Sequence, residues 1–364
     1  GGLPNAYATI VSADAATPSH APAVFSRIFA IYNVNIHNVT LPGRNDELGF
    51  FFMRYSDDAG ASWSPDRYPV PYPDTWIDRN NHIPYNGSVP DMRLMWTVDQ
   101  VKVLPGSSSS SSSSSSSAVF AFTKIGAYVQ NPPQEIYVMS SSTLLDDTVL
   151  PEDISWTMLP EGSDHGVQCL SGFDCNKTVN EEGHVLPLSV RSGGKVAVMA
   201  RSDTGYLSIA TRDSKLRPIP GRPEGAGSWN NTVSSGSGGQ FVPLSNVTVE
   251  TLPKTPGAKP VSEVVRAGVK HPRGPFTPKE VGGAGSGVYL MLFYNYKGSA
   301  EPWFGRDPYF LSCGREVDGT ILFSQPEIAL FDRLYHGGTS GGGYPDFIVS
   351  GSLGGDDAGL DVHI

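Results

Sequence analysis

The sequence predicts an all-β fold, and three observations carry that prediction. Runs rich in β-branched and aromatic residues recur along the whole chain. Gly and Pro, 41 and 30 of the 364 residues, bound most of these runs, as expected of short strands joined by turns. A sustained helical period of apolar residues is hard to find. The expected strands are 23–32, 49–55, 92–103, 118–124, 135–139, 195–201, 206–211, 287–294, 309–313 and 347–350.

The segment after the aromatic run 49–55 has the spacing Ser-x-Asp-x-Gly-x-x-Trp, from Ser56 to Trp63. We expect Asp58 to accept hydrogen bonds from the turn backbone, Gly60 to take a positive φ and Trp63 to pack under the hairpin. An ordinary Asp/Gly turn does not explain the Trp at a fixed offset. The segment resembles the Asp box, a turn typical of sialidase-like β-propellers. A decayed second copy at 211–214 lacks the Gly and the Trp.

This resemblance implies a six-bladed β-propeller of sialidase type, since blades of about 50–60 residues give about six in this length. A β-sandwich is the competing all-β fold. Ser, Gly and Pro cluster where a packed core cannot form, so we expect flexible inserted loops there. We expect one domain, 1–364, with loops at about 104–117, 221–240, 253–262 and 336–343.

The charge balance excludes some partners. A formal charge of -10 and a pI near 5.2 argue against nucleic acid and against an anionic membrane surface. No apolar run approaches the roughly 20 residues that a membrane-spanning helix needs, so membrane insertion is not expected. An anionic substrate is still compatible, because a few local arginines can hold a carboxylate. The chain opens Gly-Gly-Leu-Pro, from which we expect a processed or truncated form.

Several features favour a secreted or cell-surface protein. N-glycosylation sequons begin at Asn38, Asn86, Asn176, Asn230 and Asn246. Cys169 and Cys175 bracket a short loop and are expected to form a local disulfide in an oxidising compartment. Cys313 lies in an expected strand, where a buried free thiol is the better interpretation. Three cysteines with this spacing make no zinc site.

Further segments resemble a group of uncharacterised secreted sialidase-like proteins with BNR repeats. The resemblance is carried by 55–63, 78–81, 120–124, 164–166, 181–182, 270–273, 305–309, 324–327 and 344–346. It implies a propeller with a pocket that faces carbohydrate. Sialidases hold the substrate carboxylate with three arginines and use a Tyr nucleophile, a Glu and an Asp acid/base. The region that corresponds to the first of these arginines, 3–10, contains none, and Arg27 is the nearest candidate.

Two sets of candidate residues follow. The carboxylates and a late tyrosine are candidates for acid/base and nucleophilic catalysis: Asp78, Glu181, Glu182, Tyr344 and Asp346. Cations and other polar groups near expected strand ends are candidates for substrate binding: Arg79, His165, Arg201, Lys270, His271, Arg273, Arg306 and Glu327. The alternatives are surface ion pairs for the arginines, a solvated acidic turn for Glu181–Glu182 and a packing role for Tyr344.

The function that fits best is a secreted glycoside hydrolase acting on terminal sugars, acidic ones included, of glycans or cell-wall polysaccharide. No metal-ligand cluster or phosphate-binding loop is present in the sequence, so no cofactor is expected. The alternative is a non-catalytic carbohydrate-binding or structural propeller, which the missing arginine and the abundant sequons also fit. A polysaccharide lyase that uses His271 with Tyr344 is a third hypothesis. The sequence does not define the oligomeric state.

Overall fold

The computed structural model describes 5–12, 27–35, 49–80, 93–104, 116–126, 134–167, 180–189, 194–202, 208–217, 230–231, 241–242, 276–282, 285–294, 309–317, 319–324, 327–330, 346–352 and 359–363. The chain divides into two compact units. The first unit comprises Gly1–Ala200 and Ile209–Asn230, and the second comprises Arg201–Ser208 and Asn231–Ile364. The predicted single domain stays a prediction.

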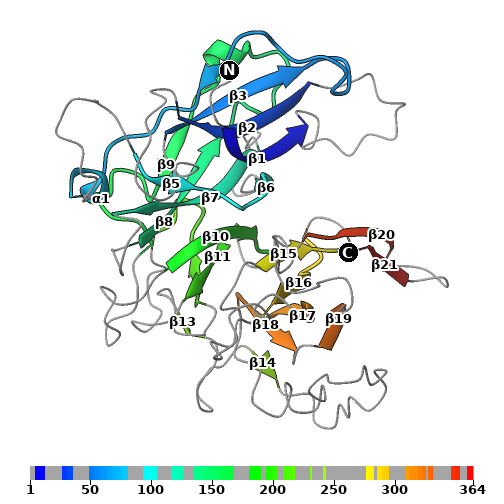
Figure 1. Ribbon diagram of the computed structural model, residues 1–364. Helices are drawn as coiled ribbons and strands as arrows, with labels where there is room; N and C mark the ends of the chain where they lie inside the picture. Colours follow the sequence, from blue (N-terminus) through cyan, green and yellow to red (C-terminus); the bar gives the residue numbers. More distant parts are fainter. Residues whose placement is uncertain are drawn as a thin grey trace, which may run out of the picture. The chain divides into compact units, whose positions relative to one another are not determined.

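Strands dominate the described residues of both units (Figure 1). Helical structure there is confined to a single α-helical turn, α1 (Trp76–Arg79), and a 3-10 turn at Pro151–Asp153. The predicted all-β class is therefore confirmed. Within the described part of the chain, no helix has the length and apolar character needed to span a membrane. These sheets do not define a blade count, so six blades stays a prediction.

The first sheet is an antiparallel meander in which each strand pairs with the next one along the chain. Its members are β1 (Asn5–Ser12), β2 (Ile28–Val34), β3 (Phe50–Ser56) and β4 (Tyr68–Pro69). Side chains of β3 alternate between core and surface, so Phe51 and Met53 are buried. The strand predicted at 49–55 is confirmed to within one residue at each end.

The second sheet shows that one predicted strand, 92–103, is wrong. Its members are β5 (Met95–Trp96), β6 (Lys102–Leu104), β7 (Ser117–Ile125), β8 (Gln134–Ser141) and β9 (Thr157–Leu159). β5 and β6 pair with β7 separately. Between them, Thr97 Oγ1 donates to the carbonyl of Ala121 at 2.6 Å, and Asp99 Oδ2 accepts from the Ala121 amide at 2.8 Å. These side chains replace the ladder partners of β7 and so interrupt the strand.

β7 separates two cores, because successive side chains of a strand point to opposite faces. Phe120 and Phe122 face the first sheet, where each ring meets Phe51 edge-on with centroids 5.4 Å apart. Val119 and Ala121 belong to the core shared with the third sheet. That sheet is ordered β10 (Asn180–Pro187), β11 (Val196–Ser202), β12 (Ser208–Arg212) and β13 (Asn230–Asn231). The second sheet of the first unit therefore packs between the other two.

A buried carboxylate also joins the second and third sheets. Asp99 Oδ2 accepts from the amide of Val185 at 3.1 Å, and Oδ1 contacts His184 Nδ1 at 2.9 Å and Lys102 Nζ. Burial on its own would raise the pKa of Asp99, but Lys102 and His184 outweigh it and hold this pKa below its ordinary value. Asp99 is therefore a charged tie between β7 and β10.

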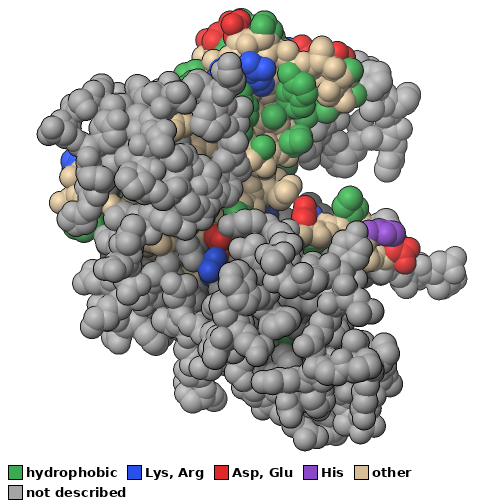
Figure 2. Space-filling model, in the orientation of Figure 1, with side chains coloured by type: hydrophobic (Ala, Val, Ile, Leu, Met, Phe, Trp, Pro, Cys, Tyr) green, Lys and Arg blue, Asp and Glu red, His purple; other side chains and the backbone are tan. Residues whose placement is uncertain are grey.

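The turn between β3 and β4 confirms the predictions for Asp58 and Gly60. Asp58 Oδ1 accepts from the Ser62 amide at 2.8 Å and Oδ2 accepts from the Ser62 hydroxyl at 2.5 Å. These donors, with the Ser56 hydroxyl, lower the pKa of Asp58 to about 2. Gly60 has φ 88°, and the half-buried ring of Trp63 lies 4.0 Å from the point where a Gly60 Cβ would stand. Figure 2 shows acidic side chains over this part of the first unit.

The decayed copy at 211–214 also forms an Asp-centred turn. Asp213 Oδ1 accepts from the amides of Lys215 at 2.9 Å and Arg217 at 2.8 Å. Its carboxylate thus reaches the residue four positions on, as Asp58 does. Leu216 takes a positive φ of 58°. The hydrogen-bond pattern is therefore retained without the Gly and the Trp.

The second unit contains a six-stranded sheet and a two-stranded sheet. The larger has the order β14-β18-β17-β16-β15, with β19 also on β17. Its strands are β14 (Phe241–Val242), β15 (Phe276–Glu280), β16 (Val288–Tyr294), β17 (Tyr309–Val317), β18 (Thr320–Ser324) and β19 (Glu327–Leu330). The smaller pairs β20 (Ile348–Ser352) with β21 (Gly359–His363). Phe347 packs with Leu290 and Leu292 in the core of this unit.

Three details of the predictions need correction. Cys313 was expected to be buried but is exposed, because it alternates along β17 with buried Ser312 and Gly314. The loop expected at 104–117 is shorter, since Leu104 ends β6 and Ser117 begins β7. The loop at 221–240 contains β13, and Asn230 begins that strand. Outside the described residues lie Cys169, Cys175, Asn38, Asn86, Asn176 and Asn246, as well as the loops at 253–262 and 336–343.

Candidate functional site

α1 forms where the sequence supplies both halves of a capping box. Thr75 precedes the helix, and Asp78 Oδ2 accepts from the Thr75 amide at 2.8 Å and from its hydroxyl at 2.9 Å. Ile77 is fully buried and anchors the turn, whereas Trp76 is 37% exposed. The short helix therefore fixes the backbone of Trp76 while its indole reaches solvent.

A buried lysine of β7 holds α1 in place. Lys124 is fully buried, and its Nζ lies 2.6 Å from Asp78 Oδ2 and 3.1 Å from the carbonyl oxygen of Pro73. The ammonium group also lies 5.0 Å from the ring centroids of Tyr72 and Tyr137. Burial lowers the pKa of Lys124, and Asp78 opposes this. Among the described residues, all the hydrogen bonds of the Asp78 carboxylate are made by Oδ2, and Oδ1 has no partner.

Glu135, the second residue of β8, orients a histidine. Its Oε1 lies 2.8 Å from His165 Nδ1, and its Oε2 accepts from the Gly166 amide at 3.1 Å and from the Tyr137 hydroxyl. Burial, with Glu135 adding to it, raises the pKa of Tyr137, so the phenol keeps its proton and donates. A carboxylate only accepts hydrogen bonds, which places the His165 proton on Nδ1 and leaves Nε2 for proton transfer.

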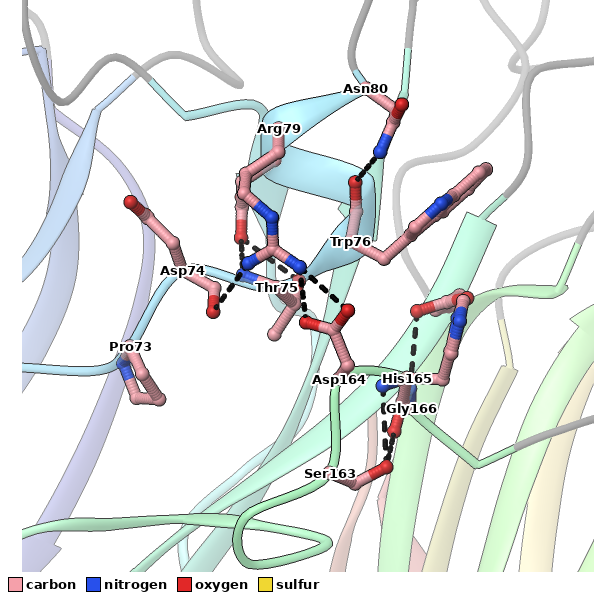
Figure 3. A network of polar contacts seen from close by, with 12 residues as sticks. Pro73, Asp74, Thr75, Trp76, Arg79, Asn80, Ser163, Asp164, His165 and Gly166 are labelled. Carbon is pink, nitrogen blue, oxygen red and sulfur yellow. Dashed lines mark hydrogen bonds and ion pairs between the residues drawn. The ribbon is translucent and has the colours of Figure 1, made fainter.

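An ion pair links α1 to the segment that carries His165 (Figure 3). Arg79 Nη2 lies 2.5 and 2.6 Å from the two carboxylate oxygens of Asp164, and the Trp76 amide donates to the Asp164 carbonyl at 3.0 Å. Arg79 lowers the pKa of Asp164. The rings of Trp76 and His165 lie side by side, with centroids 5.4 Å apart and planes tilted by 34°.

We call this set the α1 cluster. Its members come from four segments that are far apart in the chain: Trp76, Asp78, Arg79, Lys124, Glu135, Tyr137, Asp164 and His165. The α1 cluster lies near the start of β3, and two backbone hydrogen bonds show this. The amide of Gly49, just before β3, donates to the carbonyl of Arg93. The carbonyl of the next residue, Leu94, accepts from the amide of Ile125, which follows Lys124. The Asp58 turn lies where β3 ends. The first unit thus has a cluster end and a turn end.

The structure brings together three of the residues proposed from the sequence, Asp78, Arg79 and His165. Glu182, the third residue of β10, has a positive φ of 52° and is buried, as expected for a carboxylate that points inward; nothing is described of the Glu181 side chain. In the second unit, Asp346 pairs with Lys279 at 2.6 Å and is half exposed.

The remaining proposed residues are not tested. Arg201 is half-buried near the end of β11, and Glu327 begins β19. Lys270, His271, Arg273, Arg306 and Tyr344 lie outside the described residues. In the described ranges, no three His, Cys, Asp or Glu side chains are grouped to hold a metal ion.

Sequence reasoning missed Lys124 and Glu135. Lys124 ends the largely apolar predicted strand 118–124, and a charged residue in such a run indicates a buried partner. Glu135 faces Lys124 across the β7–β8 pair, a register that becomes visible only once the hairpin is recognised. The sequence offered one indication of this pair: Lys124 lies near the end of β7 and Glu135 near the start of β8, on the two sides of the same connection.

Comparisons with known proteins give weak structural likenesses. No protein-family model matches the sequence, and no curated protein matches it either. Among solved structures, the intramolecular trans-sialidase of Ruminococcus gnavus matches 76% of this chain with TM-score 0.34 and 11% identity. A family 117 glycoside hydrolase of Zobellia galactanivorans matches 88% with TM-score 0.40 and 10% identity. An exo-inulinase of Aspergillus awamori matches 90% with TM-score 0.37 and 12% identity.

The lengths of these proteins differ from that of the chain. The match covers 39% of the trans-sialidase, 75% of the family 117 hydrolase and 52% of the exo-inulinase.

Proposed function

We propose that this chain is a sialidase-like β-propeller that works as a glycoside hydrolase on terminal sugars of glycans or cell-wall polysaccharide. Face-to-face packing of successive antiparallel sheets supports the propeller. So does the Asp58 turn, which has the spacing and hydrogen bonds of an Asp box. Six blades, counted over both units, complete the proposed fold.

The observation that carries the proposed activity is the α1 cluster. Hydrolysis of a glycosidic bond needs a carboxylate on one side of the sugar and a proton donor on the other. Asp78, held by Lys124, supplies a carboxylate with one open oxygen. His165, oriented by Glu135 and partly exposed, acts as the proton donor when both of its ring nitrogens are protonated: the Nδ1 proton stays on the Glu135 hydrogen bond and the Nε2 proton passes to the leaving oxygen. Exposed Trp76 provides an apolar face beside His165.

A non-catalytic carbohydrate-binding propeller is the second candidate. It is favoured by Glu135, both of whose oxygens already accept hydrogen bonds within the protein. Such saturation is typical of a structural carboxylate as well as of one that orients a histidine.

Other parts of the proposal concern the cellular setting. We place the protein outside the cell, with sugars on its sequons and a disulfide between Cys169 and Cys175. Mass spectrometry of the secreted protein, with and without reduction, measures both modifications.

The other residues predicted from the sequence stay part of the proposal. The proposed ligand-binding residues are Arg201, Lys270, His271, Arg273, Arg306 and Glu327. The proposed catalytic candidates are Glu181, Glu182, Tyr344 and Asp346.

A panel of fluorogenic glycosides tests the activity. It includes neutral sugars and conjugates of sialic and uronic acids. For a substrate that the native protein cleaves, His165→Ala and Glu135→Gln are expected to lower kcat by roughly 100-fold or more. The matched control is Glu152→Gln, which changes an exposed carboxylate in the 3-10 turn of the same unit.

Two outcomes would contradict parts of this proposal. Full turnover by a folded His165→Ala variant would remove His165 from the mechanism. Cleavage of no glycoside, with glycan binding retained, would replace the hydrolase by the carbohydrate-binding propeller.

A further inference from the structure

Trp76 is a rigid aromatic surface at the α1 cluster. Its amide donates to the Asp164 carbonyl at 3.0 Å, and its own carbonyl accepts from the Asn80 amide at 3.0 Å and the Asn80 side chain at 2.8 Å. The backbone is thus fixed on both sides, yet 37% of the residue is exposed. A fixed, exposed indole loses little conformational entropy when a flat apolar surface packs on it.

His165 extends this surface and adds a polar edge. Its ring lies beside the indole (Figure 3). Glu135 fixes the orientation of the ring through Nδ1. The histidine side chain is 38% exposed. A sugar ring has an apolar face of C–H groups and a rim of hydroxyls. The adjacent rings of Trp76 and His165 match the apolar face of the sugar, and the oriented imidazole of His165 matches its rim of hydroxyls.

The charges around this surface are already paired. Arg79 pairs with Asp164, Arg93 with Asp74 and Lys124 with Asp78. In the described part of the cluster, every lysine or arginine therefore has a carboxylate partner within ion-pair distance. A sugar carboxylate placed here would have to displace one of three existing carboxylates. The hydroxyls of an uncharged sugar, in contrast, can share Arg79 and Asp164 without breaking their ion pair.

We propose that Trp76 and His165 form a stacking subsite for a neutral sugar ring of a glycan chain. This inference rests on the proposed glycan-related function but not on catalysis. It also narrows the substrate, because the sugar bound at this subsite is uncharged even where the chain carries acidic groups elsewhere.

Isothermal titration of the full chain with matched oligosaccharides tests the subsite. The probes are neutral cello-, xylo-, manno- and galacto-oligosaccharides, with oligogalacturonate and sialyllactose as acidic counterparts. We expect at least one neutral series to bind more tightly than either acidic probe. Trp76→Ala should weaken that binding by about tenfold, and Trp76→Phe should retain most of it. Leu150→Ala, which truncates another exposed apolar residue of the same unit, is the matched control.

The outcomes separate this inference from the hydrolase. Tighter binding of an acidic probe, or neutral binding unchanged in Trp76→Ala, overturns the subsite even if glycosides are cleaved. Binding of no glycan by the native protein overturns it as well. Neutral binding that depends on Trp76 supports the subsite, and absent turnover would then count against hydrolysis alone.

Discussion

The two ends of the first unit hold their carboxylates in different ways. At the turn end, the hydrogen-bond partners of Asp58 are Ser56 and Ser62, within four positions in the chain. At the cluster end, Asp78 pairs with a lysine 46 positions away and Glu135 contacts a histidine 30 positions away. A local turn closes as soon as its own residues meet. The cluster forms only when several strands and α1 have packed. Because that packing then holds its side chains in fixed positions, they are preorganised for a ligand.

Loss of the buried lysine should give the largest difference between the two ends. Lys124→Met leaves Asp78, whose side chain is 7% exposed, without its cation, and we expect a loss of about 4 kcal/mol in the free energy of unfolding. The matched change at the turn end is Arg27→Met, which breaks an ion pair with the 55% exposed side chain of Asp57. It should cost about 1 kcal/mol or less. Urea unfolding of both variants measures the difference.

A double variant tells ion pairing apart from loss of packing. Asp78→Asn combined with Lys124→Met should be more stable than Lys124→Met alone, because the uncompensated charge is gone. Equal stability of the two would mean that Asp78 does not depend on Lys124.

Substituting alanine for one glycine at each end compares how tightly the backbone is packed at the cluster end and at the turn end. At the cluster end, a Cβ on Gly49 would stand 2.0 Å from the carbonyl oxygen of Val34, so Gly49→Ala should cost about 3 kcal/mol or more. At the turn end, Gly60 shares the positive φ but meets only the Trp63 ring, at 4.0 Å. Gly60→Ala should therefore cost about 1 kcal/mol. Thermal unfolding of the two variants checks the order, which equal losses would contradict.

The same contrast explains what the sequence could reveal. The backbone hydrogen bond of Asp58 and the positive φ of Gly60 were predicted correctly, because the partners of this turn lie within one short segment. The capping box at Thr75 and Asp78 has that property too, but Asp78 was predicted as a catalytic carboxylate and not as a helix cap. The pairing of Lys124 with Asp78, and of Glu135 with His165, depends on strand register. A single sequence does not give that register.

The ion pair of Arg79 tests how much of the cluster is needed for folding. Both side chains are about half exposed, at 51% for Arg79 and 50% for Asp164, so solvent screens them. Arg79→Met should change the free energy of unfolding by about 0.5 kcal/mol, well below Lys124→Met. If the subsite exists, the same variant should still weaken neutral-glycan binding in titration calorimetry. A stability loss as large as that of Lys124→Met would instead make Arg79 part of the core.

The smallest effect concerns the pH dependence at the turn end. Because the pKa of Asp58 is lowered from 3.8 to about 2 on folding, its contribution is fully present above pH 3.8 and disappears as the pH falls through 2. Asp58→Asn should thus lower stability at neutral pH, and its difference from the native protein should shrink between these two values. Urea unfolding at a series of pH values measures this difference. Asp66→Asn, which removes an exposed charge from the same loop, is the control. A difference that stays constant down to pH 2 would mean that the turn does not depend on the ionised carboxylate, and that the hydroxyl of Ser56 suffices to hold it.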